Sequence, residues 1–433
     1  NIGKYAELAM QEYKSSQELA NYCEQQGFKL KKGVADIPTA FVAEYGSGNP
    51  IIAVMGEFDA LPGLSQKNVP YKEEFEKNGN GHGCGHNMFG AGSVGAAVTI
   101  KKLIENGKLK GTIRFYATPA EEDKAGKVYM ARAGLFNDVD ICLDWHPDAK
   151  IAANMQSTQA VTDYDFNFIG KSAHAAADPW LGRSALDAAE LFNIGVNFLR
   201  EHIKPSVRIH YVYKDAGKVP NVIPNTASVW LWIRDSKRAG VAEVEKRVLD
   251  IAKGAALMAG VNYEVKINNG LYEILINESG AKALQKNVEL LGNISYTQEE
   301  LNYAEKLMKE YGNSYNGIDG NVHPLLTTKE DPDGGSTDVG DISYIVPEIS
   351  LYVTTAPAFA PWHSWVVVSC CGMSIGHKGM IYAAKALALT MIDLFENKSL
   401  VEQIKKEFKE RKGKEVWKAI IPDGLPPVPP VNK

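Results

Sequence analysis

The chain has 433 residues, a formal net charge of −5 and an apolar content of 45%. This length exceeds one ordinary hydrophobic core, so we expect two domains of globular composition. The weak negative charge gives no basis for binding nucleic acid or an anionic membrane, and no apolar run is long enough to span a bilayer. Five cysteines in this length are typical of reduced thiols and predict a cytoplasmic protein. The sequence begins at Asn1 without a methionine, which leaves room for an upstream segment, and it shows no signal-peptide pattern.

The first 155 residues alternate short apolar runs with amphipathic segments. This pattern predicts an α/β fold in which helices flank a mostly parallel sheet. The expected strands are 39–45, 51–55, 111–116 and 140–143. The expected helices are 3–27, 88–103 and one that follows residue 122.

A different pattern begins near residue 156, where alternating strands replace the buried runs. The expected strands are 163–169, 207–213, 227–233 and 261–267, and the expected helices are 182–203 and 241–259. The βαββαβ order predicts a ferredoxin-like α+β insert with an antiparallel sheet over residues 156–272. The catalytic domain would then consist of residues 1–155 and 273–433.

The last part of the chain is expected to return to the first domain. Helices are predicted at 274–291 and 299–311, a strand at 349–354, and an apolar helix from His377 to residue 394. Residues 313–335 are rich in Gly, Asn, Asp and Pro and predict a long loop, which in a compact domain is usually functional or mobile. The proline-rich tail at 422–430 is expected to be extended.

Residues 80–87 hold two histidines, one cysteine and three glycines in eight positions. Thiolate and imidazole are preferred ligands of zinc and its neighbours, and the glycines let the backbone bend so that Cys84 and His86 face one centre. The expected helix at 88–103 follows directly, and its electropositive N-terminus is expected to lower the pKa of the Cys84 thiol. One cysteine and two histidines do not complete a catalytic site, so further ligands are expected elsewhere.

Acids and histidines follow three consecutive strands of the first domain. In chain order they are Glu57 and Asp59, Glu121 and Glu122, and His146. Taken singly, each is more often a solvated turn residue or a structural one. Because ligand sites in α/β folds lie beyond the carboxyl ends of the strands, three such strand ends together favour a site.

As a set, these motifs resemble the amidohydrolase branch of the dinuclear metallopeptidase and aminoacylase superfamily. The resemblance covers nearly the whole chain and rests on EFDALPG (57–63), GHGCGHN (81–87), PAEE (119–122), WHP (145–147), AHAA (173–176), GRSALDA (182–188), STDVGD (336–341), WHSW (362–365) and HKGM (377–380). It implies two divalent metal ions, zinc or manganese, above a parallel sheet. The implied ligands are Cys84, His86, Glu122, His146 and His363.

The resemblance also implies roles for two acids. Glu121 would be the general base that takes a proton from the attacking water, and Asp59 would orient a metal ligand. Some branches carry a ligand histidine where this chain has Glu57, so the identity of the bridging ligand stays open.

Four residues of the insert are candidates for contacting substrate. In relatives the insert dimerises, so His174 or Asn221 would reach a site in the same or the partner chain and stabilise the oxyanion. Arg183 and Arg234 are candidates to pair with a substrate carboxylate, because a guanidinium matches it bidentately. The alternatives are a surface role for His174 and local pairing for Arg183. The remaining histidines are expected to be structural or surface residues: His82, His202, His210, His323 and His377.

The function implied by the resemblance is metal-dependent hydrolysis of an amide bond to an amino acid, such as the p-aminobenzoyl-glutamate bond. The partners would be a small-molecule amide, a second copy in a homodimer and a related second subunit. The alternatives are an N-acyl-amino-acid deacylase, a small-peptide carboxypeptidase or dipeptidase, and a non-catalytic metal-binding assembly protein. The intact Glu121 and Glu122 and the full ligand set argue against the non-catalytic alternative.

Overall fold

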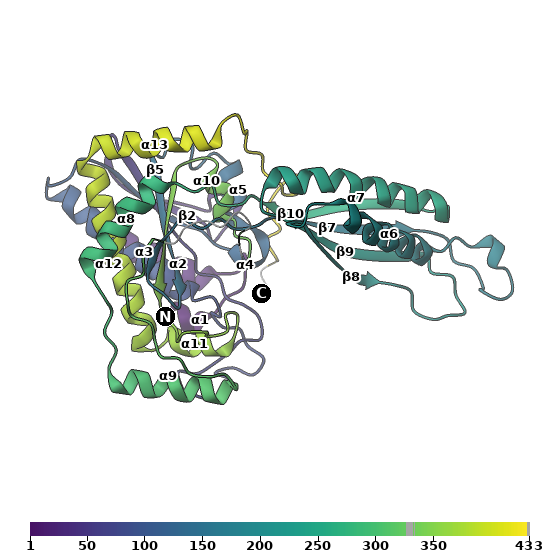
Figure 1. Cartoon of the computed structure of the whole chain (residues 1–433), viewed down its shortest axis with the longest axis horizontal. Coiled ribbons are helices and arrows are strands. Elements are labelled where there is room, and N and C mark those ends of the chain that lie inside the picture. Colours follow the sequence, from purple (N-terminus) through teal and green to yellow (C-terminus); the bar gives the residue numbers. More distant parts are fainter. Residues whose placement is uncertain (326–331, 333, 431–433) are drawn as a thin grey trace.

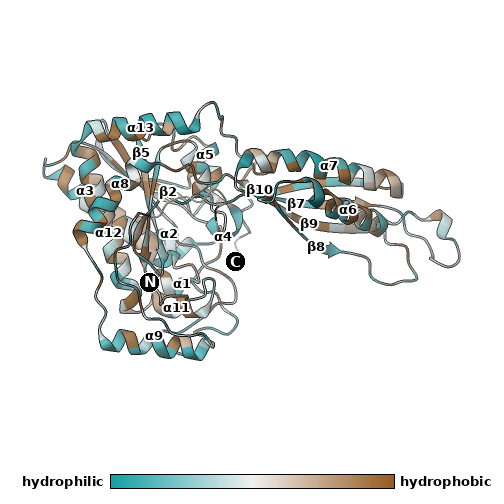
Figure 2. Cartoon of the chain, viewed as in Figure 1, coloured by the Kyte–Doolittle hydropathy of each residue, from teal (hydrophilic) through white to brown (hydrophobic). Residues whose placement is uncertain are grey.

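Two separate β-sheets organise the computed structural model, which describes residues 1–325, 332 and 334–430 (Figure 1). The larger sheet lies in a broad α/β domain, and the smaller one lies in an arm that extends from it. The strands of both sheets contain many apolar residues, shown in brown in Figure 2, whereas the surface helix α13 (Lys398–Lys412) is largely hydrophilic. None of the described helices is both long and apolar enough to cross a membrane.

The larger sheet has seven strands in the order β1-β2-β4-β3-β5-β11-β6. Its four central strands are mutually parallel: β4 (Gly111–Ala117), β3 (Ile51–Gly56), β5 (Ile141–Asp148) and β11 (Glu348–Thr354). The antiparallel outer strands are β1 (Lys29–Lys32), β2 (Phe41–Ser47) and β6 (Ala152–Asn154). The predicted mostly parallel sheet is therefore confirmed. Strands β1 and β6 were not predicted, since they are only four and three residues long.

Helices cover both faces of this sheet. Val54 of β3 and Leu143 of β5 belong to one core, whereas Met55 and Cys142, the residues next to them, belong to the other. The first core is closed by α2 (Tyr13–Gln25), α3 (His86–Glu105), α8 (Glu278–Leu291) and α12 (Ser374–Glu396). The second core is closed by α5 (Gly126–Arg132) and α10 (Val339–Ser343).

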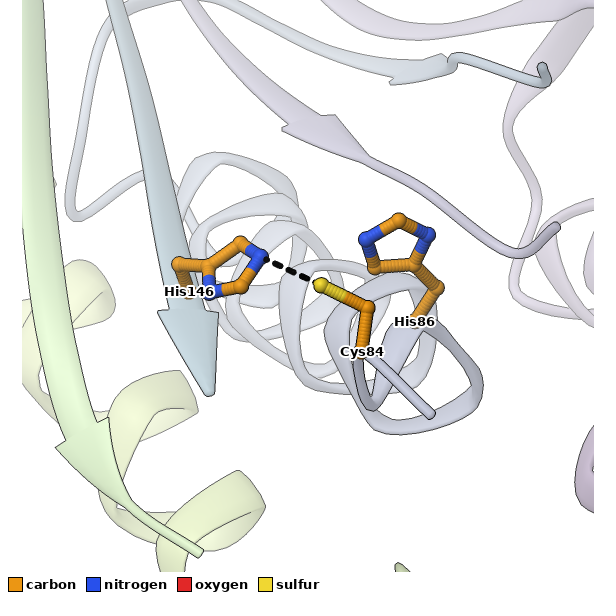
Figure 3. A group of neighbouring side chains, drawn as sticks. All are labelled: Cys84, His86 and His146. Atoms are coloured by element: carbon orange, nitrogen blue, oxygen red, sulfur yellow. Dashed lines mark hydrogen bonds between the residues drawn. The ribbon is translucent and has the colours of Figure 1, made fainter. Parts of the chain in front are cut away.

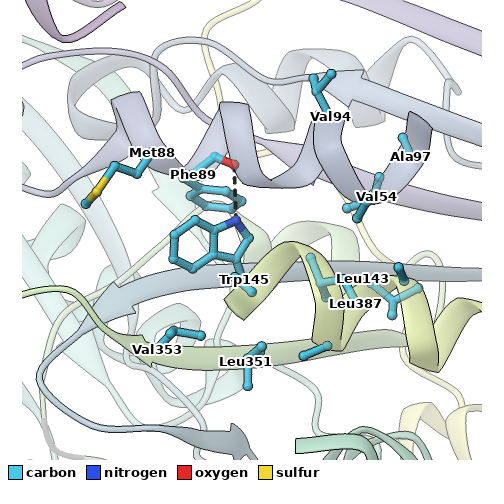
Figure 4. Packing of buried hydrophobic residues seen from close by; sticks show 14 of the residues in the cluster. Val54, Met88, Phe89, Val94, Ala97, Leu143, Trp145, Leu351, Val353 and Leu387 are labelled. Carbon is cyan, nitrogen blue, oxygen red and sulfur yellow. Dashed lines mark hydrogen bonds between the residues drawn. The ribbon is translucent and has the colours of Figure 1, made fainter. Parts of the chain in front are cut away.

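Trp145, at the centre of the first core, fixes α3 against the sheet. Its side chain is fully buried, and its indole Nε1 donates a hydrogen bond to the Phe89 carbonyl at 3.1 Å (Figure 4). The two rings lie 5.9 Å apart, a contact worth roughly 0.5–1.5 kcal/mol beyond its burial. Gly92 faces the indole so closely that a Cβ there would lie 3.0 Å from it. This packing fixes the helix whose first residue is His86.

The helix predicted at 3–27 is wrong as a single element. The chain forms α1 (Ile2–Tyr5), breaks, and forms α2 eight residues later. The break begins at Ala6, which adopts a left-handed conformation with φ 40°. The carboxylate of Glu7 then accepts hydrogen bonds from backbone N–H groups in the first turn of α2. This side-chain contact competes with a continuous helix.

The smaller sheet has the antiparallel order β10-β7-β9-β8, which confirms the ferredoxin-like arrangement. Its strands are β7 (Ala160–Ile169), β8 (Arg208–Asp215), β9 (Thr226–Asp235) and β10 (Asn262–Leu271). The helices α6 (Ala185–Leu199) and α7 (Arg238–Ala259) cover one face of it. We call residues 160–271 the lid.

The lid places two of its loops far from the larger sheet. β7 leaves the α/β domain at Ala160 and ends at Ile169, which pairs with Thr226 at the start of β9. The loops 170–184 and 216–225 therefore both lie at the far end of the lid (Figure 1). We call them the distal loops.

The chain after the lid contains more helix than predicted. The expected helix at 299–311 is α9 (Gln298–Tyr311), but α10, α11 (Trp365–Cys371) and α13 were not predicted. The predicted long loop lies partly outside the described residues, and its described part contains no helix or strand. The described part of the tail at 422–430 also has no helix or strand, as expected.

The close approach of α3 to the end of β3 can be tested at Gly90. The Gly90 N–H donates to the Glu57 carbonyl at 2.9 Å, and an added Cβ would lie 2.8 Å from that oxygen. We expect Gly90→Ala to lower the free energy of unfolding by about 1–3 kcal/mol through overpacking. Gly95→Ala in the same helix is the control, because its Cβ would lie 3.5 Å from Ala384. It should leave stability unchanged or raise it by about 0.5–1 kcal/mol; equal denaturation midpoints for the two variants would contradict the close approach.

Candidate metal centre

The loop before α3 brings Cys84 and His86 to the carboxyl end of the parallel strands. Gly85 adopts a left-handed conformation with φ 82°, and a Cβ there would lie 2.8 Å from Pro147. The expected position of the cluster just before a helix is confirmed, since α3 begins at His86. Figure 3 shows the Cys84 sulfur between the rings of His86 and His146, with His146 near the end of β5.

Cys84, His86 and His146 form one group of metal-ligand atoms, all within 4.8 Å of one another. The Cys84 Sγ lies 3.4 Å from His146 Nε2. The other ring nitrogen of His146, Nδ1, lies 2.8 Å from the Pro147 carbonyl, and a donated hydrogen bond there leaves Nε2 with a free lone pair. Burial lowers the pKa of His146 to about 4, so its imidazole is neutral and able to bind a metal.

Cys84, Glu122 and His363 form a second group with the same spacing limit. His363 Nε2 lies 3.5 Å from Glu122 Oε2. His363 adopts a left-handed conformation with φ 56°, held by a hydrogen bond from its N–H to the Gly83 carbonyl. Ala120, just before the Glu121–Glu122 pair, also has a left-handed φ of 64°. Left-handed residues other than glycine cost roughly 1–2 kcal/mol each, a strain that clusters at functional sites.

Glu57, His86 and Glu121 form a third group. Glu57 Oε2 lies 2.9 Å from His86 Nε2. Asp59 holds the other side of the histidine, since its Oδ1 lies 2.9 Å from His86 Nδ1. The second oxygen of Asp59 accepts a hydrogen bond from the Glu122 N–H at 2.9 Å. One buried carboxylate therefore orients residues of all three groups.

The site concentrates negative charge in a buried place. Burial, together with the nearby Glu57 carboxylate, raises the pKa of Glu121 well above its ordinary value, and burial raises the pKa of Glu122 to about 7. Burial would lower the pKa of His86, but the acids around it outweigh burial and raise it. These directions show a site that favours added positive charge.

The expected low pKa of the Cys84 thiol is wrong for the protein's own groups. Burial raises the pKa of Cys84 to about 12, and the neighbouring His86 does not compensate. The field of the helix N-terminus is therefore weaker than the loss of hydration. A bound divalent cation would reverse this balance, because a coordinating thiol is deprotonated outright.

The residues present fit divalent metal ions. Glu57 Oε2, His86 Nε2 and Glu122 Oε1 are buried, and none has a hydrogen-bond partner among the described residues. Glu57 Oε2 and His86 Nε2 lie 2.9 Å apart, but their geometry is not that of a hydrogen bond. Sulfur, imidazole nitrogen and carboxylate oxygen are the ligand types that zinc accepts. Unsatisfied buried atoms of these types are what a metal site requires.

The lid residues do not join this cluster within one chain. His174 and Asn221 lie in the distal loops, where His174 is exposed and its Nδ1 accepts hydrogen bonds from backbone N–H groups. Arg183 donates to the carbonyls of Trp180 and Gly182. Arg234, on β9, lies over the ring of Trp232 at 4.9 Å. The structure thus places none of the four beside the five predicted ligands of the same chain.

Three buried residues of the site were missed. Lys127 contacts Glu57 and Asp338, and Glu12 accepts a hydrogen bond from the Ala120 N–H at 2.9 Å. Glu12 and Lys127 are charged residues on expected helices, where charged side chains are usually exposed, and no signal in the sequence marks them as buried. Asp338 lies in the STDVGD motif, which marked the segment but gave this residue no role.

His82 has the structural role predicted for it. Its ring lies between the carbonyls of Asp59 and Ile2, at 3.1 and 3.2 Å, and burial lowers its pKa to about 4. His82 and Asn87 line a cavity of about 740 Å³. None of the five predicted ligands lines it.

A mostly parallel sheet whose strand ends gather sulfur, nitrogen and oxygen atoms of metal-ligand type is the arrangement expected of a metal-dependent hydrolase. The chain belongs to the peptidase family M20/M25/M40, whose model matches residues 53–308. The expected class, a hydrolase acting on amide C–N bonds, is therefore confirmed, and the non-catalytic alternative loses its support.

Two curated relatives match nearly the full chain. One of the polypeptides that form the p-aminobenzoyl-glutamate hydrolase of Escherichia coli is 35% identical, over 99% of this chain and 94% of that protein. The Xaa-Arg dipeptidase of Mus musculus is 28% identical, over 93% and 86%.

A solved structure shares the fold. The aminobenzoyl-glutamate utilization protein of Klebsiella pneumoniae superposes with a TM-score of 0.66 at 19% identity, covering 91% of this chain and 94% of that one. A dinuclear metal-binding peptidase of family M20 from Bacillus subtilis gives 0.62 at 20% identity, covering 90% and 94%.

The ligand set predicts loss of metal in three single variants. Cys84→Ala, His146→Ala and His363→Ala each remove one donor atom, so bound metal and turnover should fall together. His202→Ala, on the lid surface, is the control and should keep both. Elemental analysis of the purified proteins, alongside an amide-hydrolysis assay, measures the two quantities. Full metal content with normal turnover in the three ligand variants would rule out the site as described.

Proposed function

We propose that this chain is a dinuclear metal amidohydrolase that cleaves p-aminobenzoyl-glutamate to p-aminobenzoate and glutamate. The observation that carries the proposal is the convergence of two ligand groups that share Cys84. The substrate is inferred from the full-length similarity to a polypeptide of the Escherichia coli p-aminobenzoyl-glutamate hydrolase.

The proposed ligands divide between the two groups. Cys84, His86 and His146 would hold one ion, and Cys84, Glu122 and His363 the other. Because Cys84 belongs to both groups, its sulfur would help to hold either ion. Divalent metals bound there would polarise the amide carbonyl and acidify the attacking water. Thiolate favours zinc, whereas carboxylates also suit manganese, so we propose zinc or manganese.

Glu121 is the proposed general base. It lies with Glu57 and His86, outside the group that contains its neighbour Glu122. Its carboxylate would take the proton of the attacking water and deliver it to the leaving nitrogen. Asp59, which contacts both His86 and the Glu122 N–H, would keep the ligands in position.

The lid is proposed to form a homodimer through its outer strand β8. This strand exposes Val212 and Tyr213, and the neighbouring α6 exposes Ile194 and Phe198, with exposed fractions of 41–70%. Natural proteins rarely leave a bare strand edge beside apolar residues. Pairing β8 with its copy across a two-fold axis would cover both.

Such pairing would complete the active site in trans. A two-fold axis sets the two β8 strands antiparallel, so the distal loops of one lid approach the α/β domain of the partner. His174 and Asn221 would then reach the partner's metal centre and stabilise the oxyanion. Arg183 lies in the same loop, where its backbone forms a β-bridge with that of Lys171. It would approach with His174 and Asn221 and pair with the substrate carboxylate. Arg234 remains the second candidate for that pairing.

Two further proposals concern the protein's setting. All five cysteines are free, and four of them lie in the hydrophobic cores, which supports a cytoplasmic location; the four are Cys23, Cys142, Cys370 and Cys371. A related second polypeptide is proposed as a partner, because the other polypeptide of the Escherichia coli hydrolase is 31% identical over 53% of this chain and 55% of that protein.

The Xaa-Arg dipeptidase relative supports a second candidate substrate class, small dipeptides. The two are separated by a screen in which p-aminobenzoyl-glutamate, N-acyl amino acids and Xaa-Arg dipeptides are supplied with and without chelator. Release of p-aminobenzoate at the highest kcat/KM supports the proposal. Exclusive release of free arginine would replace it with the dipeptidase.

Glu121→Gln should separate the base from the ligands. The amide keeps the shape of the side chain but does not accept the proton, so kcat should fall by roughly 10²–10⁴. Metal content should stay at the wild-type level, because Glu121 lies outside the two ligand groups. Glu122→Gln is the matched comparison and should lose metal. The opposite pattern in the two variants would mean that the two glutamates have exchanged roles.

His174→Ala should lower kcat more than it raises KM, since the contact acts mainly in the transition state. Mixed with Glu121→Gln, it should regain activity, because a heterodimer holds one site with both groups intact. Val212→Lys in both partners is the control: a monomer by light scattering should give no regain. Confirmed exchange of protomers without regained activity would exclude action in trans.

A further inference from the structure

A fully buried ion cluster lies beside the metal centre. Lys127, on α5, has no exposed surface, and its Nζ lies 2.5 Å from Glu57 Oε1 and 2.7 Å from Asp338 Oδ1. The Lys127 N–H also donates to the second oxygen of Asp338 at 2.9 Å. Lysine is almost never fully buried unless it is paired, so this arrangement is a built feature of the fold.

The two oxygens of Glu57 face different partners. Oε1 contacts the ammonium group of Lys127, whereas Oε2 lies 2.9 Å from His86 Nε2 without a hydrogen-bond partner among the described residues. Glu57 is itself only 1% exposed, so solvent does not compete for either oxygen. Oε1 of Glu57 is therefore held by Lys127, whereas Oε2 points at the ligand groups.

Asp338 fixes the lysine from the other side. Its carboxylate is fully buried and binds Lys127 through both oxygens, one to the side chain and one to the backbone. The ammonium group is thus tied on two sides, which leaves little freedom to follow a rotation of Glu57. A point charge held in this way sets the direction of the carboxylate that it contacts.

We propose that Lys127 is a positioning residue of the metal centre, which holds Oε1 of Glu57 and leaves that carboxylate a single oxygen for a metal beside His86. This inference rests on the dinuclear centre proposed above. Glu57 would then add one oxygen, and not two, to the proposed ligands Cys84, His86 and His146 of that ion. The nearby ammonium charge would also weaken the attraction of a bound cation to the site.

A purely structural role for Lys127 makes a different prediction. A lysine that only ties α5 to Asp338 would, when removed, loosen the site, so stability and metal affinity would fall together. A positioning role predicts the opposite sign for metal affinity, because Glu57 is released with its full charge and both oxygens. The sign of that change separates the two roles.

The test compares the wild type with Lys127→Met, with the double variant Lys127→Met/Asp338→Asn, and with Lys101→Met as a control. Lys101 is also a mostly buried lysine in an ion pair, with Glu105, but it lies on α3 in contact with Tyr45. Each full-length protein is stripped with a chelator and titrated with Zn²⁺ in competition with a chromophoric chelator. The melting temperature, kcat and KM are measured on the same preparations.

Lys127→Met should bind Zn²⁺ about tenfold more tightly, since a cation near the ion has been removed. Its kcat should fall roughly 10–100-fold with little change in KM, because Glu57 is no longer held in one orientation. The double variant removes one charge of each sign. It should therefore return to within about threefold of the wild-type affinity while kcat stays low. Lys101→Met should change neither quantity.

Two results would overturn the inference. One is weaker Zn²⁺ binding in Lys127→Met together with a lower melting temperature, which marks a structural lysine. The other is wild-type kcat in the double variant, which removes the need for Lys127 to hold Glu57. If Lys127→Met does not fold, the double variant decides alone, because it keeps the net charge of the wild-type cluster. A wild type that binds no Zn²⁺ or Mn²⁺ would instead overturn the dinuclear centre itself.

Discussion

Like-charge crowding at the carboxyl ends of β3 and β4 is the constraint on which the rest of the structure depends. Glu57 and Asp59 follow β3, and Glu121 and Glu122 follow β4, so the parallel pairing of these strands brings four carboxylates together. Buried carboxylates repel one another and are stable only with cations or hydrogen-bond donors nearby. The groups around the site supply one or the other: histidine rings, backbone N–H groups and a buried lysine.

The fold meets this cost by making the surroundings rigid. Trp145 fixes α3 to the sheet, Gly85 turns the chain into that helix, and Ala120 and His363 hold left-handed conformations beside the ligands. Each strained residue is held by a hydrogen bond or by packing from another element, so the strain is distributed over the α/β domain. The ligand atoms are therefore held close together by the protein alone, which lowers the cost of binding a metal.

Patterns of short range predicted the central sheet and the five candidate ligands. A short apolar run such as Ile51–Gly56 can be recognised as a buried strand from its residues alone. A Cys-Gly-His segment has few roles besides metal binding. What the sequence did not reveal depends on contacts between distant residues. Lys127 and Asp338 are 211 positions apart. The low thiol pKa failed for the same reason, because burial from the whole fold outweighs the local helix field. The break before α2 was missed for another reason, because a local side-chain contact from Glu7 to the Lys14 N–H competes with the helical pattern.

The division of the chain into an α/β domain with the candidate metal centre and a distant lid bears on the proposed mechanism. The ligand groups lie in the α/β domain, whereas His174 lies in the distal loops at the far end of the lid. A group that stabilises the oxyanion must lie about 3 Å from it, so the proposed role of His174 would require the site of a partner chain. The exposed β8 edge and the apolar side chains on α6 lie on the surface that a second copy would cover. In the proposed homodimer, assembly and catalysis would be one requirement, because the contact that buries the lid edge would also bring His174 to the partner's site.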